Sequence, residues 1–259
     1  MIKISHLLET ARYAAIEAGK VIMEVYHRPE FSTKLKKDNT PSTQADRRAH
    51  TIITGFLKKT NLPVLSEEGM NIDYVERKSW DYFWLIDPLD GTREFLNKNG
   101  EFTVNIALMH ENIPLAGIIY VPCTDTMYYG SKQTGIYKHK EGNRSQILPL
   151  KERVEYDQLV RKEQLVVVIS RSHSSISTNS FTGQLKNVTL RYIGSSLKFM
   201  ILLENLADIY PRFGSTMEWD TAAAHALLNA SNRGVYNTDL KSELTYNKPD
   251  LINPAFIAF

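Results

Sequence analysis

Apolar and polar positions repeat with different periods along this chain, and the period indicates where helices and strands lie. Near the N-terminus, apolar residues recur every three or four positions, which predicts a long helix with one buried side. Its apolar positions are Leu7, Leu8, Ala11, Ala14, Ala15, Ala18, Val21, Ile22 and Val25. The same spacing returns over residues 49–57, so we expect a second helix there.

Short apolar runs after the second helix predict strands. The run "PVLS", which begins at Pro63, and the run "YFWLI", which begins at Tyr82, are each followed by acidic residues. Residues 101–140 hold four further β-rich runs separated by turn residues, an arrangement typical of an antiparallel meander. Residues 141–163 are polar and charged, which favours a variable loop or a boundary.

Beyond residue 163 the pattern changes to alternating strands and helices. The runs "QLVVVIS", "VTLRYIG" and "ADIYPRF" predict strands, and "SLKFMILLENL" and "DTAAAHALLNA" predict helices. We therefore expect an α+β half at 1–140, with an antiparallel sheet, and an α/β half at 141–259. The sequence contains no internal repeat and no low-complexity segment.

Composition narrows the class of protein. The 31 Lys and Arg residues nearly balance the 29 Asp and Glu residues, which argues against nucleic acid polymers or anionic membranes as partners. Cys123 is the only cysteine, so a reducing, cytoplasmic location is expected. No run approaches the roughly 18 apolar residues of a membrane-spanning helix. Attachment to the inner face of the cell membrane stays compatible with the sequence, as do a monomer and a homodimer.

The segment "LIDPLDGT" places two carboxylates at the end of an apolar strand. In a continued strand Asp87 and Asp90 would point to opposite faces, but Pro88 lacks an N–H for the ladder, so we expect the chain to turn there. Gly91 permits close backbone approach, and Thr92 can cap a short helical turn. Such a turn brings both carboxylates and a carbonyl to one point, which suits magnesium. The simpler alternative is a plain strand end followed by a turn.

Three other acidic residues lie at predicted element ends. Asp46 begins the second helix, Glu67 follows the "PVLS" strand, and Asp220 precedes the last helix. Each has a simpler interpretation, since Asp46 and Asp220 can cap helices and Glu67 can belong to a solvated turn. Acids at so many element ends nevertheless favour a shared site.

These motifs, in this order, carry a resemblance to a known family. The series "KKDNTPSTQAD", "PVLSEEG", "WLIDPLDGTREF", "GEFTVNIAL" and "WDTAAAHALL" is similar to the magnesium-dependent phosphatase superfamily of inositol monophosphatases and fructose-1,6-bisphosphatases, over nearly the whole chain. The resemblance implies a layered αβαβα sandwich. The pieces "ISRSH", "GSSLKF" and "YPRFG" resemble more particularly the bacterial 3′(2′),5′-bisphosphate nucleotidases, which act on adenosine 3′,5′-bisphosphate.

The resemblance implies two sets of residues around the reacting phosphate. The first would bind two magnesium ions, one of its carboxylates bridging both, and it comprises Glu67, Asp87 (the bridging residue), the Leu89 carbonyl, Asp90 and Asp220. The second set, Asp46 and Thr92, would hold and deprotonate the attacking water, and a third ion would fit near Asp46. Two ions suit this chemistry because hydrolysis of a phosphate monoester needs charge neutralisation and an activated water.

A third implied set would contact the substrate, and it comprises Glu67, Gly91, Thr92, His173, Ser195, Lys198, Arg212 and Asp220. Its basic and polar members at residues 173–212 would face the second, non-reacting phosphate, because Arg and Lys suit phosphate groups. The simpler interpretations are a solvated helix residue for Lys198 and a turn residue for His173. Two positions depart from the family pattern. Arg93 replaces a lysine, and Glu218 replaces an apolar residue and adds negative charge near the site.

The sequence thus predicts a magnesium-dependent phosphatase that converts adenosine 3′,5′-bisphosphate to AMP and phosphate, which would connect it to sulfur metabolism. An inositol monophosphatase or a broad sugar-phosphate phosphatase is the alternative on the same scaffold, and a pocket for the second phosphate separates the two. A nucleotide-binding module without turnover is the alternative of another class. Such a module is expected to lack Asp46, Glu67 or Thr92, all of which this chain keeps.

Overall fold

The computed structural model describes residues 2–29, 33–35, 41–172 and 175–259, and no helix among them is both long and apolar enough to cross a membrane. The described α-helices are α1 (Ile4–Tyr26), α2 (Gln44–Leu57), α3 (Tyr74–Arg77), α4 (Thr92–Leu96), α5 (Tyr156–Leu159), α6 (Ile176–Gln184), α7 (Leu197–Leu203) and α8 (Ala222–Ala230). The described strands are β1 (Thr33–Leu35), β2 (Pro41–Thr43), β3 (Val64–Ser66), β4 (Tyr82–Asp90), β5 (Thr103–His110), β6 (Ile113–Val121), β7 (Thr126–Ser131), β8 (Gly135–Lys140), β9 (Asn143–Ile147), β10 (Leu165–Ser170), β11 (Val188–Ile193), β12 (Tyr210–Arg212), β13 (Val235–Asn237) and β14 (Phe256–Ala258). Short 3-10 helices are η1 (Lys58–Thr60), η2 (Pro122–Thr124) and η3 (Glu218–Asp220).

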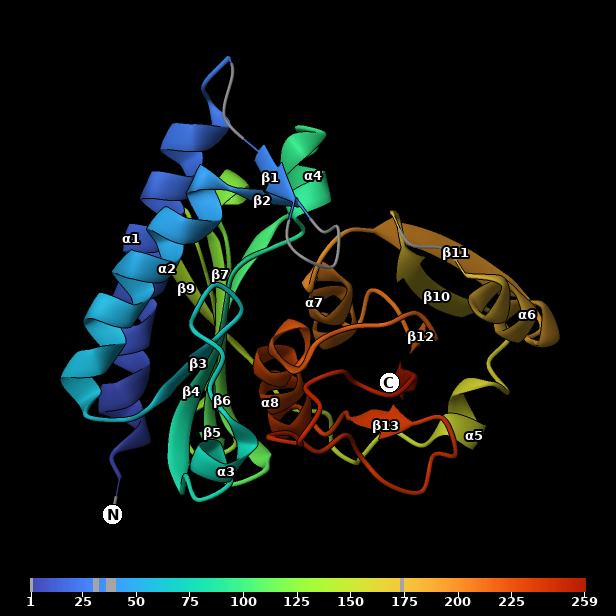
Figure 1. Cartoon of the computed structure of the whole chain (residues 1–259). Helices are drawn as coiled ribbons and strands as arrows, with labels where there is room; N and C mark the ends of the chain where they lie inside the picture. Colours follow the sequence, from blue (N-terminus) through green and yellow to red (C-terminus); the bar gives the residue numbers. More distant parts are fainter. Residues whose placement is uncertain (1, 30–32, 36–40, 173–174) are drawn as a thin grey trace.

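Helical and β layers alternate through the molecule (Figure 1). Helices α1 and α2 lie on one face of a large sheet, and α7 and α8 lie on the other. Beyond α7 and α8 come two of the smaller sheets, β10-β11 and β12-β14-β13, and then α5 and α6 (Figure 1). The αβαβα sandwich expected from the sequence is confirmed. Because the large sheet is covered on both faces, its strands read as continuous apolar runs rather than as alternating ones.

The large sheet has the strand order β3-β4-β5-β6-β7-β8-β9. Its β3–β4 pair is parallel, and every following pair is antiparallel, as the meander predicted for residues 101–140 requires. Strands β10 and β11 form a parallel pair, and β12-β14-β13 form an antiparallel sheet. The polar segment 141–163 was expected to be a loop or boundary, but it contributes β9 to the edge of the large sheet. The division of the chain at residues 140 and 141 stays a prediction.

Strand β4 continues through Pro88, which corrects the expectation that this proline ends it. In the ladder with β5, Asp87 lies opposite Asn105 and Asp90 lies opposite Thr103, so three steps along β4 match two along β5. The extra residue is a β-bulge, a place where a sheet tolerates proline and where a strand changes the direction of its side chains. The bulge, rather than a turn, is what lets Asp87 and Asp90 face the same space.

Close packing of α8 on β6 depends on Gly117. A Cβ added at this glycine would lie 2.0 Å from the backbone oxygen of Ala223, which cannot move without displacing the helix. Gly117→Ala is expected to lower the free energy of unfolding by about 3 kcal/mol, measured by urea denaturation. Gly55→Ala in α2 is the matched control, because nothing lies within 4 Å of the added Cβ and alanine favours a helix. A Gly117→Ala protein as stable as the wild type would contradict this packing.

Candidate active site

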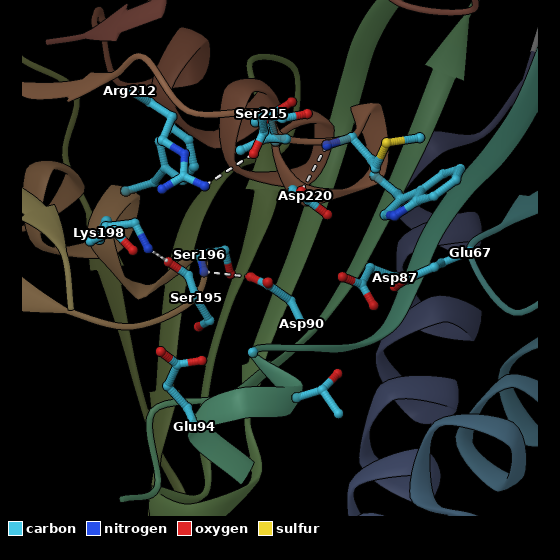
Figure 2. A pocket seen from close by; sticks show the side chains of 18 of the residues that line it. Glu67, Asp87, Asp90, Glu94, Ser195, Ser196, Lys198, Arg212, Ser215 and Asp220 are labelled. Atoms are coloured by element: carbon cyan, nitrogen blue, oxygen red, sulfur yellow. Dashed lines mark hydrogen bonds between the residues drawn. The ribbon is translucent and has the colours of Figure 1, made fainter. Parts of the chain in front are cut away.

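A cavity of about 320 Å³ lies where the end of β4 meets α4, α7, β12 and η3 (Figure 2). The predicted site residues that line it are Glu67, Asp87, Leu89, Asp90, Gly91, Thr92, Ser195, Lys198, Arg212 and Asp220. Asp46 lies just behind this lining and contacts Thr92. His173 lies outside the described residues. The structure therefore brings together residues that are far apart in the sequence.

Three carboxylates converge at the centre of the cavity (Figure 2). The side chains of Asp87, Asp90 and Asp220 each offer an oxygen, and these oxygens lie within 4.8 Å of one another. Within the described part of the chain, none of the three forms an ion pair with a Lys or Arg at contact distance. A buried cluster of acids without a compensating cation fits a hard divalent metal ion such as magnesium.

The electrostatics of the cluster agree with this fit. Burial is the main cause that raises the pKa of Asp87 well above its ordinary value, and the neighbouring charges of Glu67, Asp90 and Asp220 raise it further. Burial and the charge of Asp90 likewise raise the pKa of Asp220. Burial raises the pKa of Asp90 to about 6, although Lys198 opposes the shift. A bound cation would stabilise the charged carboxylates and so oppose both the burial and the repulsion that raise these pKa values.

Backbone N–H groups orient two of these carboxylates. Leu89 N–H donates to Asp87 Oδ1 at 3.0 Å, which forms the tight bend of the bulge. Met217 N–H donates to Asp220 Oδ2 at 2.8 Å, so Asp220 caps the 3-10 helix η3 and not the last helix, α8, as its simpler interpretation had it, because Thr221 occupies the N-cap position of α8. Glu67, directly after β3, reaches Asp87 through a side-chain hydrogen bond and its charge. These contacts fix the carboxylates without placing a positive charge among them.

The third carboxylate, Asp90, accepts hydrogen bonds from the start of α7 and from β5. Ser196 N–H donates to Asp90 Oδ2 at 2.6 Å, and Asn105 Nδ2 donates to the same oxygen at 3.4 Å. Ser196 Oγ in turn donates to Asn105 Oδ1 at 2.8 Å and bonds Thr103 Oγ1 at 2.7 Å. Asn105 and Thr103 were not predicted from the sequence. Their signal was available, because they are polar residues two apart on one face of an apolar strand.

Asp46 and Thr92 meet beside the acid cluster. Asp46 Oδ2 accepts from Thr43 N–H at 2.7 Å, while the Thr43 side chain accepts from the backbone of Asp46, and these two bonds make a capping box at the start of α2. Thr43 Oγ1 also donates to Asp46 Oδ2 at 2.5 Å. Asp46 Oδ1 accepts from Thr92 Oγ1 at 3.3 Å, so the capping interpretation and the contact with Thr92 both hold. Thr92 was expected to cap α4, and this is wrong, because Gly91 occupies the N-cap position. Thr43 was missed, although "TQAD" has the spacing of a capping box.

A basic wall faces the acids across the cavity (Figure 2). Lys198 is only 5% exposed, so it is not a solvated helix residue, and its Nζ donates to the Ser195 carbonyl at 2.5 Å. Burial lowers the pKa of Lys198 to about 8, although the charge of Asp90 opposes this. Arg212 is 8% exposed, and its Nη2 donates to the Ser215 carbonyl at 3.0 Å. These bonds hold two cations at the opening of the acid cluster.

Glu218 does not add its negative charge to the cavity, which corrects the expectation from the sequence. The residue is fully buried and is absent from the cavity lining. Its carboxylate accepts from Asn247 N–H at 2.6 Å and from Lys248 N–H at 3.1 Å, and it forms an ion pair with Lys248 Nζ at 2.5 Å. Glu218 therefore anchors the C-terminal segment beside η3 and is neutralised there.

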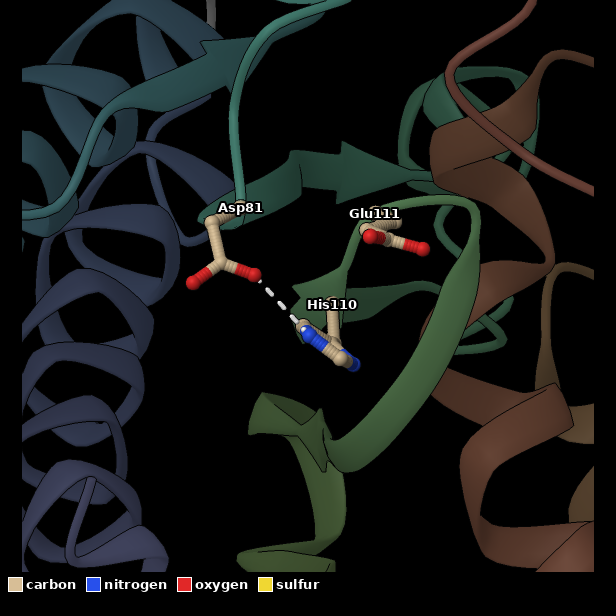
Figure 3. A group of neighbouring side chains, drawn as sticks. All are labelled: Asp81, His110 and Glu111. Atoms are coloured by element: carbon tan, nitrogen blue, oxygen red, sulfur yellow. Dashed lines mark ion pairs between the residues drawn. The ribbon is translucent and has the colours of Figure 1, made fainter. Parts of the chain in front are cut away.

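A second group of potential metal ligands lies on the surface, away from this cavity (Figure 3). It consists of Asp81, His110 and Glu111, and Asp81 forms an ion pair with His110 at 2.9 Å. Both acids are exposed to solvent, which screens their charges. The group is a surface ion pair with a neighbouring acid, and it provides a useful control for substitutions in the cavity.

Comparison with known proteins gives consistent likenesses. Residues 3–256 match the model of the inositol monophosphatase family. The chain is 39% identical over 253 residues to the 3′(2′),5′-bisphosphate nucleotidase CysQ of Salmonella typhimurium, covering 96% of this chain and 98% of that protein. It resembles the crystal structure of CysQ from Bacteroides thetaiotaomicron with a TM-score of 0.82 and 41% identity, covering 97% and 96% of the two chains. An inositol monophosphatase of Thermotoga maritima shares the fold at a TM-score of 0.75 and 20% identity, covering 97% and 91%.

Proposed function

The chain belongs to the inositol monophosphatase family, and from this premise we propose that it is a metal-dependent 3′(2′),5′-bisphosphate nucleotidase. The observation that carries the proposal is the pairing of an acid cluster with a basic wall in one cavity. The acids suit metal ions that bind a reacting phosphate, and the basic wall suits a second phosphate on the same substrate. We infer adenosine 3′,5′-bisphosphate as the substrate, with AMP and phosphate as products.

The metal ions would be magnesium, two in number, with room for a third near Asp46. The residues that would hold the two ions are Glu67, Asp87, Leu89 through its carbonyl, Asp90 and Asp220. When bound, the ions would neutralise charge on the phosphate and lower the pKa of water at the site. The raised pKa values of the three aspartates support this assignment, because burial and the neighbouring carboxylates disfavour the charged forms that a bound cation would favour.

Asp46 and Thr92 would handle the proton of the attacking water. The Thr92 hydroxyl donates to Asp46 Oδ1, so its oxygen is oriented to accept a hydrogen bond from water in the cavity. A proton can then pass from water through Thr92 to Asp46. Burial raises the pKa of Asp46 to about 6, which brings this carboxylate closer to neutral pH, where a general base works best.

The basic wall would set specificity. Lys198 and Arg212 would bind the second phosphate, Lys198 as a point charge and Arg212 by its planar fork. Gly91, Thr92 and Ser195 would contact the substrate nearer the metal ligands, as would Glu67 and Asp220. His173 stays a prediction, since it lies outside the described residues. A cavity of about 320 Å³ is large enough for part of a nucleotide.

Cellular context follows from the substrate and from composition. Removal of a 3′-phosphate from this nucleotide would connect the enzyme to sulfur metabolism. A cytoplasmic location rests on the single Cys123 and is a prediction, as is any attachment to the inner face of the cell membrane. A monomer and a homodimer are both compatible with this function.

Phosphate release tests the proposed function directly. Adenosine 3′,5′-bisphosphate, inositol 1-phosphate and fructose 1,6-bisphosphate should be compared with magnesium present and again after addition of a chelator. The nucleotide is expected to have a kcat/KM at least about a hundredfold higher than that of inositol 1-phosphate, because the nucleotide carries a second phosphate for the basic wall and inositol 1-phosphate does not. Activity should disappear with the chelator. The proposal is abandoned if the nucleotide is turned over no faster than the inositol phosphate.

A further inference from the structure

Glu94 is a carboxylate of the cavity that the chemistry above does not use. It lies on α4, is only 3% exposed, and lines the cavity beside Gly91, Ser195 and Lys198 (Figure 2). Among the residues that the structure describes, it forms no ion pair at contact distance. Its charge acts on Lys198 and on Arg171, but neither cation pairs with it at contact distance. Buried carboxylates are rarely left without a paired cation, so this side chain calls for an explanation.

The surrounding residues fix the position of Glu94. Ser172 Oγ donates a hydrogen bond to its Oε1. A Cβ added at Gly194 would lie 2.5 Å from Glu94 Cγ, and a Cβ added at Gly91 would lie 3.3 Å from Oε2. Two glycines thus leave the space that this side chain occupies. Oε2 accepts no hydrogen bond from the described residues, so this oxygen, beside Gly91, can accept one from a ligand.

The charge of Glu94 limits what this acceptor can bind. It is close enough to the metal-binding cluster to contribute, after burial, to the raised pKa of Asp90. A carboxylate at this position repels a phosphate, so among the groups of a nucleotide it can accept only from an uncharged donor. On a ribose that carries a 3′-phosphate, the uncharged donor nearest to the phosphate is the hydroxyl on the adjacent carbon.

We propose that Glu94 Oε2 accepts a hydrogen bond from the sugar hydroxyl next to the reacting phosphate, so that the cavity contains a subsite for a vicinal hydroxyl. This inference rests on the proposed function, which places a ribose 3′-phosphate beside Asp90. The subsite makes the enzyme selective for ribonucleotides. A substrate without the hydroxyl leaves the buried Glu94 oxygen unpaired, and this costs more than the loss of a solvent-exposed bond.

Hydrolysis of two matched nucleotides tests the subsite. The ratio of kcat/KM for adenosine 3′,5′-bisphosphate to that for 2′-deoxyadenosine 3′,5′-bisphosphate is expected to be about 10 to 100 in the wild type, the size of a hydrogen bond to a charged group. Glu94→Ala should bring the ratio close to one, and Glu94→Gln should give an intermediate value. Because the ratio compares two substrates on one protein, a general loss of activity does not change it.

Glu101→Gln is the matched control. Glu101 is a neighbouring acid that pairs with Arg171 at 2.7 Å and accepts from Gly194 N–H at 2.7 Å, but it does not line the cavity. This variant should keep the wild-type ratio, whatever its absolute activity.

Two results would overturn the subsite. The first is a wild type that hydrolyses both nucleotides equally well, and the second is a wild-type ratio that persists in the Glu94 variants. If Glu94→Ala does not fold, Glu94→Gln decides the second point, since it keeps the shape of the side chain. A wild type that releases phosphate from inositol 1-phosphate but from neither nucleotide would instead overturn the proposed function, and the subsite with it.

Discussion

Replacement of Asp90 by asparagine is expected to lower kcat/KM for adenosine 3′,5′-bisphosphate by about three orders of magnitude, because charge neutralisation by a bound metal is worth several kcal/mol. Asparagine occupies the same space and can still accept from Ser196 N–H, now 2.6 Å from Asp90 Oδ2. The substitution therefore removes one charge and little else. Phosphate release measured across a magnesium titration should show weaker magnesium binding, with half-maximal activity at a higher magnesium concentration, together with lower turnover.

Stability provides the control for this variant. Without metal the cluster of carboxylates repels itself, so removal of one charge should leave the thermal midpoint in a chelator unchanged or raise it. Asp81→Asn removes an equivalent charge from the exposed group with His110 and should keep wild-type turnover. Unchanged turnover in Asp90→Asn would contradict the two-metal assignment. A lower midpoint would show instead that the loss reflects the fold.

The sequence predicts the layers of this fold well because their physical signal is local. A helix with one buried side repeats its apolar residues every three or four positions, and α1 and α2 do so over their whole lengths. The shape of β4 could not be predicted in the same way. The properties of proline alone predict a turn at Pro88. The bulge depends instead on which residues of β5 pair with β4, and the sequence of β4 does not reveal that pairing.

The candidate site likewise contains residues that the sequence predicts and residues that it does not. Acids at element ends stand out in the sequence because a carboxylate after an apolar run is unusual, which is how Asp87 and Glu67 were found. Residues that act by holding another residue give a weaker signal. Asn105 and Ser196 are 91 positions apart in the sequence and meet only because β5 and α7 meet at the cavity. Glu218 shows the opposite error, since its neutralisation by Lys248 depends on the C-terminal segment that packs beside η3.

Replacement of Asp46 by asparagine is expected to lower kcat by about a hundredfold to ten-thousandfold with little change in KM, the usual range for loss of a general base. Burial raises the pKa of Asp46 to about 6, so the carboxylate is ionised above this pH and protonated below it. At saturating magnesium, where bound cations would keep Asp90 and its neighbours ionised, the wild-type kcat/KM should therefore fall as the pH drops through about 6, and Asp46→Asn should lose this limb of the profile. A pH profile that is the same in both proteins would contradict the role of Asp46.

Thr92 allows a sharper test of the same step, because its Oγ1 lies 3.3 Å from Asp46 Oδ1 and the two side chains are proposed to act as one unit. Thr92→Val should then lose about as much kcat as Asp46→Asn, and the double variant should lose little more than either. Thr51→Val is the control, since Thr51 is an exposed residue of α2 that bonds only its own helix, at the Arg47 carbonyl. Losses that multiply in the double variant would show that Asp46 and Thr92 act independently, which a proton path through both residues does not allow.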